Sequence, residues 1–174
     1  NTLSGLTRGT SGTTAAIHST GAQVIDAATY AGFGAASSGD IVTAPGMWSL
    51  DNFGNKLIAT IFSGETFTWS SDATDATATR AVLASGTPTA SRDMLVSTPD
   101  RHLVFFGTET TIGTKSTQDQ MFIRFSSQED ITSYTPTATN SAGTQRLADG
   151  SRIMGALRGR NAIYVWTDTA LFLM

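Results

Sequence analysis

NKLIAT (Asn55–Thr60), RHLVFF (Arg101–Phe106) and NAIYV (Asn161–Val165) repeat one pattern along the chain, and this repetition predicts the fold. Each segment follows a turn, begins with polar residues and continues into apolar, partly β-branched residues that suit a strand. A second apolar run follows each segment. The pattern therefore predicts three strand pairs, each built from two neighbouring strands.

Superposition of the three segments places Ile58, Val104 and Ile163 at the same position. The second runs also correspond, because TFTWSS (Thr66–Ser71) falls on FIRFSS (Phe122–Ser127) and both end in two serines. We predict that Ile58, Val104 and Ile163 occupy equivalent buried positions in three strands. In this alignment Trp69 corresponds to Phe125.

The spacing of the repeats and the composition both favour an all-β fold. The repeats recur at intervals of roughly 45 to 60 residues, which is the range of β-propeller blades. The chain has 17 glycines in 174 residues and only 14% charged residues, and apolar residues are not sustained at helical spacing. We predict antiparallel strand pairs that repeat as β-propeller-like blades, in about three recognisable copies.

The composition divides the chain into two segments. Residues 1–46 are rich in Gly, Thr and Ser and are expected to form an N-terminal strand-and-loop segment, whereas residues 47–174 carry the β-propeller-like repeats. A propeller closes with about four to eight blades, and an open stack leaves apolar faces in water. We therefore expect the three copies to belong to a larger propeller in a longer chain, or the segment before Trp48 and another subunit to complete the packing.

Aromatic residues lie in or beside the strand pairs and are expected to pack between sheets. If Trp69 is buried in this way, its replacement by Ala costs about 3–5 kcal/mol of stability. A sugar-stacking platform would instead require Trp69 or Trp166 to be exposed. The aromatic residues in question are Trp48, Phe67, Trp69, Phe122, Phe125, Tyr164, Trp166 and Phe172.

Charge and cysteine content exclude several classes of function. The formal net charge of −3 argues against binding nucleic acid through a basic surface, although it allows transient contact with passing DNA. The absence of cysteine excludes disulfides, thiol catalysis and Cys-ligated zinc. Apolar runs are far shorter than the roughly 18 residues of a spanning helix, so we expect no membrane-spanning segment.

The ionisable residues do not form a catalytic or metal-binding pattern. His18 lies in a Thr/Ser-rich stretch, and His102 begins a repeated strand, so capping and strand-end roles suit them better than catalysis. Carboxylates that lie close together in polar loops are usually solvated. The carboxylate pairs of this kind are Asp72 with Asp75 and Glu129 with Asp130. We therefore expect no catalytic residue, metal or cofactor.

Two long polar stretches, Thr108–Gln120 and Gln128–Gly150, are the places where we expect contacts with partners, because loops on a rigid scaffold tolerate specialisation. Arginine outnumbers lysine, and arginine forms forked hydrogen bonds to carboxylates and carbonyls. We therefore predict Arg124, Arg146 and Arg152 as polar anchors of an interface.

Several segments together resemble bacteriophage tail structural proteins of the nozzle or tubular tail type, as found in short-tailed phages. The N-terminal stretch Leu3–Gly21 also resembles a Gly/Thr motif of phage tail and adaptor proteins. The segments that carry the resemblance, in order, are WSLDNFGNKLIA (48–59), IRFSSQED (123–130), YTPTATNSAGTQRL (134–147), SRIMG (151–155) and TDTALFLM (167–174).

The resemblance implies a non-enzymatic component of the virion tail, with β-propeller or related domains, assembled as a homo-oligomeric ring around the DNA ejection channel. Its implied partners are other tail or adaptor proteins and, transiently and non-specifically, the passing DNA. The alternative is a carbohydrate-binding or glycan-hydrolysing propeller domain of a phage host-recognition device. The placement of tryptophan and acidic side chains distinguishes these two functions.

Overall fold

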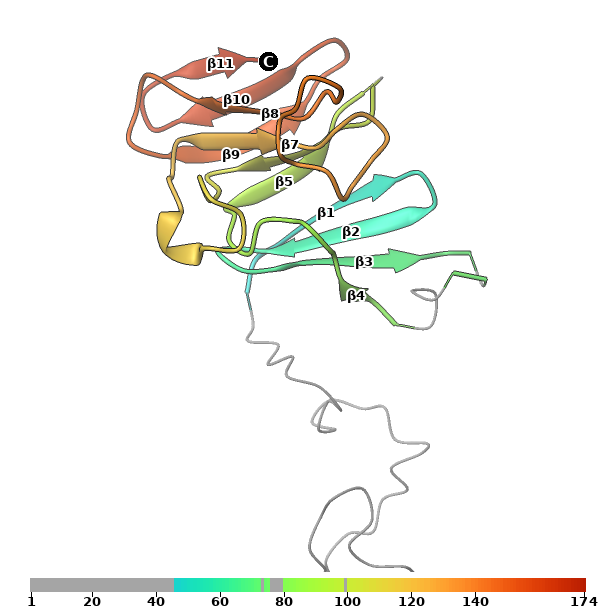
Figure 1. Cartoon of the computed structure of the whole chain (residues 1–174). Coiled ribbons are helices and arrows are strands. Elements are labelled where there is room, and N and C mark those ends of the chain that lie inside the picture. Colours follow the sequence, from blue (N-terminus) through green and yellow to red (C-terminus); the bar gives the residue numbers. More distant parts are fainter. Residues whose placement is uncertain (1–45, 73, 76–79, 99) are drawn as a thin grey trace, which may run out of the picture. The chain divides into compact units, whose positions relative to one another are not determined.

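The computed structural model describes residues 46–72, 74–75, 80–98 and 100–174 (Figure 1). All of them belong to one compact unit, which spans Ala44–Met174. The prediction for the N-terminal segment falls on residues 1–45, outside the described residues. The same is true of His18 and of the Leu3–Gly21 motif.

The described residues fold into three antiparallel sheets, with strands that follow one another in chain order. The first sheet contains β1 (Trp48–Phe53), β2 (Lys56–Ile61), β3 (Thr66–Ser70) and β4 (Val82–Leu83). The second contains β5 (Asp93–Val96), β6 (Leu103–Phe106), β7 (Phe122–Phe125) and β8 (Gly143–Arg146). The third contains β9 (Ile153–Arg158), β10 (Ile163–Thr167) and β11 (Leu171–Leu173). A short 3₁₀ turn, η1 (Lys115–Thr117), lies between β6 and β7.

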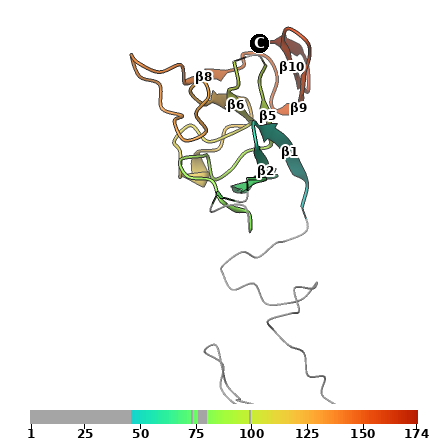
Figure 2. The ribbon, with the colours of Figure 1, turned by 90° about the vertical axis from the view of Figure 1, so that its right-hand side faces the viewer.

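The all-β prediction is confirmed, and the repeated segments form corresponding strands. The three quoted segments form β2, β6 and β10, and the second apolar runs form β3, β7 and β11. The first strands of the three sheets, β1, β5 and β9, lie side by side (Figure 2). The three sheets of the described residues do not close into a ring.

Two apolar clusters hold the sheets together, and the second sheet contributes to both. Between the first and second sheets, Ile58 packs with residues such as Leu103 and Phe105. Between the second and third sheets, Val104 packs with residues such as Ile163. Successive residues of a strand point to opposite faces, so Leu103 and Val104 bury the two faces of β6. The second sheet is therefore covered on both sides.

Ile58, Val104 and Ile163 are all buried, as predicted, but Ile163 is not equivalent to the other two. Ile58 and Val104 face the sheet that follows their own, whereas Ile163 faces the sheet that precedes it. A shift of one residue in a strand exchanges its two faces. The residue of β10 that corresponds to Ile58 and Val104 is therefore Tyr164, which is exposed.

The prediction that the tryptophans are core residues is wrong. Trp69 is 38% exposed and Trp166 is 40% exposed. Trp69 lies opposite Leu57, whereas Phe125 lies opposite Val104, so the alignment of Trp69 with Phe125 is displaced by one residue from the pairing register. That single-residue displacement places Trp69 on the outer face of its sheet.

Asp51 and Asn52 lie within β1, and the turn follows at Gly54, whose φ of 64° favours glycine. One local prediction needs correction. The stretch Gln128–Gly150, expected as a loop, contains β8. This strand is polar and exposed along most of its length, so only its pairing with β7 identifies it.

Adjacent residues of β2 provide a test of the sheet packing. Ile58 is fully buried between the first and second sheets, whereas Leu57 lies half-buried on the opposite face. We expect Ile58→Ala to reduce the free energy of unfolding by about 2–5 kcal/mol, and Leu57→Ala to cost less than half as much. Urea denaturation measures both values. Equal losses would show that β2 does not have one buried and one outer face.

Candidate functional site

The outer face of the third sheet is an exposed apolar surface. Tyr164 lies opposite both Leu157 and Leu173, and Trp166 lies opposite Leu171. Residues that lie opposite one another in an antiparallel sheet share a face. All five side chains are exposed, up to 67% for Leu173. The third-sheet face, as we call it, consists of Leu157, Tyr164, Trp166, Leu171 and Leu173.

The outer face of the first sheet has the same character. Leu50, Ala59, Phe67 and Leu83 form one row across β1 to β4. A second row places Trp69 opposite Leu57, and Trp48 packs its ring against Phe67, with 6.0 Å between the centroids. The first-sheet face consists of Trp48, Leu50, Leu57, Ala59, Phe67, Trp69 and Leu83.

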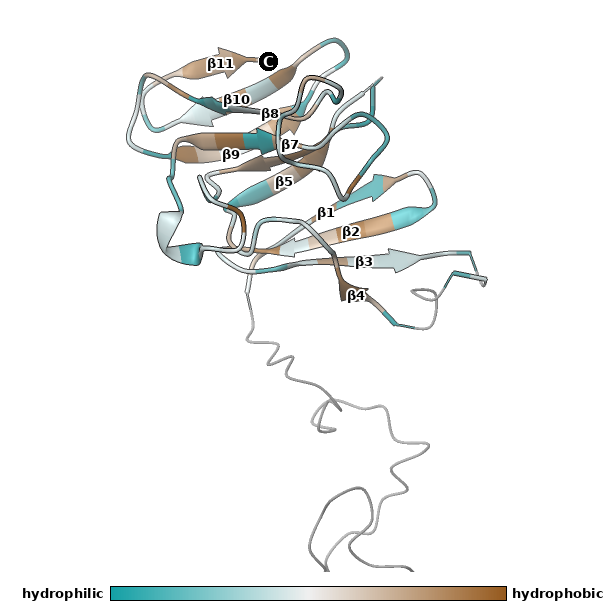
Figure 3. Ribbon diagram, viewed as in Figure 1, coloured by the Kyte–Doolittle hydropathy of each residue, from teal (hydrophilic) through white to brown (hydrophobic). Residues whose placement is uncertain are grey.

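These two faces lie at opposite ends of the row of sheets, since the second sheet is between the first and the third. Hydrophobic residues appear along β4 and β11, the edge strands of the two end sheets (Figure 3). Single exposed apolar residues are normal, but contiguous apolar patches mark interaction sites. The end faces are therefore candidate interaction surfaces.

An ion pair between Asp51 and Arg158 lies where β1, β5 and β9 meet, and its hydrogen bonds join all three sheets. The Asp51 carboxylate accepts hydrogen bonds from the backbone N–H of Val96, at 2.8 Å, and from Nη1 of Arg158, at 2.7 Å. Arg158 also donates to the carbonyl oxygen of Val96 at 2.6 Å. Charge-assisted hydrogen bonds of this kind are stronger than neutral ones. Asp51 therefore links all three sheets at this junction.

Asp93 of β5 makes a second connection between the same three strands. Its carboxylate accepts from Ser49 Oγ in β1, at 2.5 Å, and from the backbone N–H of Ala156 in β9, at 3.3 Å. Asp51, Asp93 and Arg158 line a shallow cavity of about 420 Å³ along these strands. The charged groups are thus engaged with one another and with the backbone.

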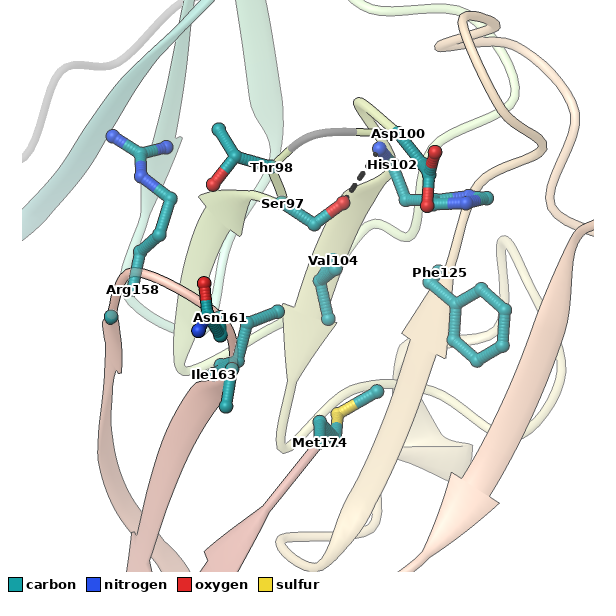
Figure 4. Close-up of a pocket in the computed structure, with 12 residues that line it drawn as sticks. Ser97, Thr98, Asp100, His102, Val104, Phe125, Arg158, Asn161, Ile163 and Met174 are labelled. Carbon is teal, nitrogen blue, oxygen red and sulfur yellow. Dashed lines mark hydrogen bonds between the residues drawn. The ribbon is translucent and has the colours of Figure 1, made fainter.

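A smaller pocket of about 200 Å³ lies between the second and third sheets (Figure 4). Polar groups, including Asp100, His102 and Asn161, occupy its rim, and Val104, Ile163 and other apolar side chains form its floor. The full lining comprises Ser97, Thr98, Asp100, His102, Val104, Phe125, Arg158, Gly159, Asn161, Ala162, Ile163 and Met174.

The hydrogen bonds in this pocket give His102 a structural role. Its Nδ1 lies 2.8 Å from the carbonyl oxygen of Ser126, so Nδ1 donates the proton, and its ring packs edge-on against Phe125. The Ser97 hydroxyl accepts from the backbone N–H of His102, at 2.9 Å, and not from its ring. Ser97 and His102 are therefore not arranged as a nucleophile and its base.

The three predicted interface arginines have different environments. Arg124 is buried and donates to the carbonyl oxygens of Glu109, Thr110 and Tyr134, so it holds two loops onto the second sheet. This burial lowers the pKa of Arg124. Its guanidinium therefore presents little surface to a partner.

Arg146 and Arg152 are exposed. Arg146 forms an ion pair with Asp119 at 2.7 Å. For these two residues the role in an interface stays a prediction.

Asp130 serves a local turn and Glu129 forms a surface ion pair. Thr132 donates from its hydroxyl and its backbone N–H to Asp130, and both hydrogen bonds lower the pKa of Asp130. Glu129 pairs with Arg101 at 2.8 Å. Among the described residues, no three His, Asp or Glu side chains lie close enough together to bind a metal, and no helix is long and apolar enough to cross a membrane.

No family model, curated protein or solved structure matches the chain. The resemblance to phage tail proteins therefore stays a prediction. The end faces were missed at the level of sequence, although the alternation Tyr164-x-Trp166 and Leu171-x-Leu173 was a signal for them. Their exposure follows only from the register and from the order of the sheets.

The ion pair between the sheets can be tested against a surface pair. We expect Asp51→Ala to lower the free energy of unfolding by about 1.5–3 kcal/mol, because it leaves the Val96 N–H without its acceptor and removes the ion-pair partner of Arg158. Glu129→Ala, which breaks the exposed pair with Arg101, is the control and should cost about 0–1 kcal/mol. Both are measured by urea denaturation at neutral pH. If the two losses were the same, Asp51 would not fix the junction of the sheets.

Proposed function

We propose that the chain is a non-enzymatic structural component of a virion, a subunit of the tail nozzle or tail-tube ring that forms part of the DNA ejection channel. The observation that carries the proposal is the pair of exposed apolar faces at the two ends of the row of sheets. A module with such faces is built to assemble with further sheets.

The arrangement of the sheets supports an arc of β-propeller-like blades. Each sheet is an antiparallel meander, neighbouring sheets pack face to face, and their first strands lie side by side, as blades do around an axis. In a stack of repeats each unit buries its faces against two neighbours. The second sheet does so, and the end faces are the surfaces that the next blades would cover.

The assignment to a phage tail rests on the resemblance, whose segments lie in both end sheets. WSLDNFGNKLIA (48–59) forms most of the β1–β2 hairpin, and TDTALFLM (167–174) includes β11. The charges also suit a channel component. Arg101, Arg146 and Arg158 are paired with carboxylates, so they offer little to phosphates, and weak contact with DNA lets it pass.

One observation favours the alternative, a carbohydrate-binding or glycan-hydrolysing propeller domain: Trp69 and Trp166 are exposed. Sugars can stack on such rings. However, a sugar site also needs polar groups that bind hydroxyls, and Trp166 has Leu171 and Gly155 as its cross-strand neighbours. The pocket of about 200 Å³ is below the usual 300–1,000 Å³ of ligand sites. The cavity of about 420 Å³ is large enough, but the carboxylates of Asp51 and Asp93 that line it already accept hydrogen bonds from neighbouring strands.

Association and glycan binding separate the two functions. We expect the full chain to associate as its concentration rises in sedimentation velocity, and to give no signal on a glycan array. A monomer that binds or cleaves a glycan, and loses this activity on Trp166→Ala, would contradict the structural function and support the alternative.

The place in the virion needs a separate measurement. Gold-labelled antibodies raised against residues 46–174 should mark the tail ring of virus particles in electron micrographs. Label on the capsid shell or on peripheral fibres would contradict a channel component, even if the chain associates in solution.

A further inference from the structure

We propose that the third-sheet face binds the first-sheet face of a second copy of the chain, head to tail, and that two copies close a ring of six sheets. This inference rests on the proposal that the chain assembles through its end faces, and it names the partner. It does not depend on the position of the chain in a virion.

The internal junctions of the chain show which face should meet which. The β2 face that carries Ile58 meets the second sheet, and the β6 face that carries Val104 meets the third. The corresponding face of β10 carries Tyr164, which belongs to the third-sheet face. If a further sheet followed the third sheet in the same way, it would therefore pack against the third-sheet face.

The reverse direction gives the other half of the junction. The second sheet meets the first with the face that carries Leu103, and the third meets the second with the face that carries Ile163. In β2 the corresponding residue is Leu57, which belongs to the first-sheet face. In both contacts within the chain, the forward face of one sheet packs against the backward face of the next. By the same rule, the third-sheet face packs against the first-sheet face of another copy.

In the first sheet, the distribution of apolar and polar residues between the two faces is the reverse of that expected for a sheet with one face in water. A one-sided antiparallel sheet normally has an apolar face toward the core and a polar face toward water. Here the exposed face carries Leu50, Phe67 and Leu83, whereas the covered face carries Asp51 and buried hydroxyl residues. These are Thr60, Thr66, Thr68 and Ser70. The exposed face is the more apolar one, so it is suited to burial.

The composition of the two faces agrees with direct apolar contact. The rows Leu157–Tyr164–Leu173 and Leu50–Ala59–Phe67–Leu83 contain no charged residue. Burial of apolar surface favours association, and these rows bury no charge that would have to be desolvated. Two such faces can therefore pack as the sheets within the chain do.

The number of described sheets suits two copies. Propellers close with about four to eight blades, so two copies of the three sheets in residues 46–174 fall within this range, whereas one copy and three copies of these sheets fall outside it. Two head-to-tail junctions cover all four end faces. A self-pairing of one face would leave the other face of each copy exposed, which a closed assembly avoids.

Two full-length variants test the pairing. The first, Leu157→Glu with Leu173→Glu, places charges on the third-sheet face. The second, Leu50→Glu with Leu83→Glu, places the same charge on the first-sheet face. All four positions are more than half exposed in the protomer, so the fold should tolerate the changes. Far-ultraviolet circular dichroism and urea denaturation check this.

A control variant carries the same added charge away from both faces. Thr144→Glu with Gln145→Glu alters two exposed positions of β8, in the second sheet. The wild type and this control should sediment as a dimer with twice the 18.2 kDa mass of the protomer. The two face variants should each sediment as monomers under the same conditions.

The mixture of the two face variants gives the decisive result. Each keeps one intact face, and the two intact faces are complementary, so an equimolar mixture should recover a dimer that neither variant forms alone. The dissociation constant of this mixed dimer should be at least about tenfold larger than that of the wild type, because only one of the two contacts between the copies has both faces unaltered.

Other outcomes would overturn the proposal. A dimer of the Leu157/Leu173 variant alone would show that the first-sheet faces pair with each other, and a dimer of the Leu50/Leu83 variant alone would show the same for the third-sheet faces. A wild type that stays monomeric would mean that another chain covers the faces. If the wild type dimerises head to tail but does not lie in a tail ring, only the proposed function fails.

Discussion

The rest of the structure depends on the burial of the second sheet between its two neighbours. Its strands supply apolar side chains to both intersheet clusters, through Leu103 and Phe105 on one side and Val104 and Phe106 on the other. Large core side chains of this kind contribute most of the stability of a small β domain. The end sheets are held by one face each, so their apolar outer faces are left exposed.

Apolar burial alone does not fix the order of the sheets, and the polar contacts of β1, β5 and β9 supply that order. Asp51 and Asp93 each bind groups from both other sheets. Carboxylates have directional hydrogen bonds, so they allow one relative position of the strands. These contacts matter for the proposed function, because a protein that assembles through its two end faces needs a rigid connection between them.

The sequence predicted the strand class and the corresponding strands, since Ile58 and Val104 share one local pattern. It did not predict the face of each residue. The repeats differ by one position in register, and only backbone pairing shows that Trp69 lies opposite Leu57. Likewise, the buried Arg124 and the exposed Arg146 are indistinguishable in sequence, because their surroundings come from loops that fold over the second sheet.

Tryptophan fluorescence tests the central claim, that the end faces become covered when the protein assembles. All three tryptophans of the chain, Trp48, Trp69 and Trp166, lie exposed on these faces, so their emission reports on nothing else. The emission should shift to shorter wavelength, and acrylamide quenching should fall, as the protein concentration rises. An emission spectrum and a quenching constant that stay the same across the concentration range would contradict the claim.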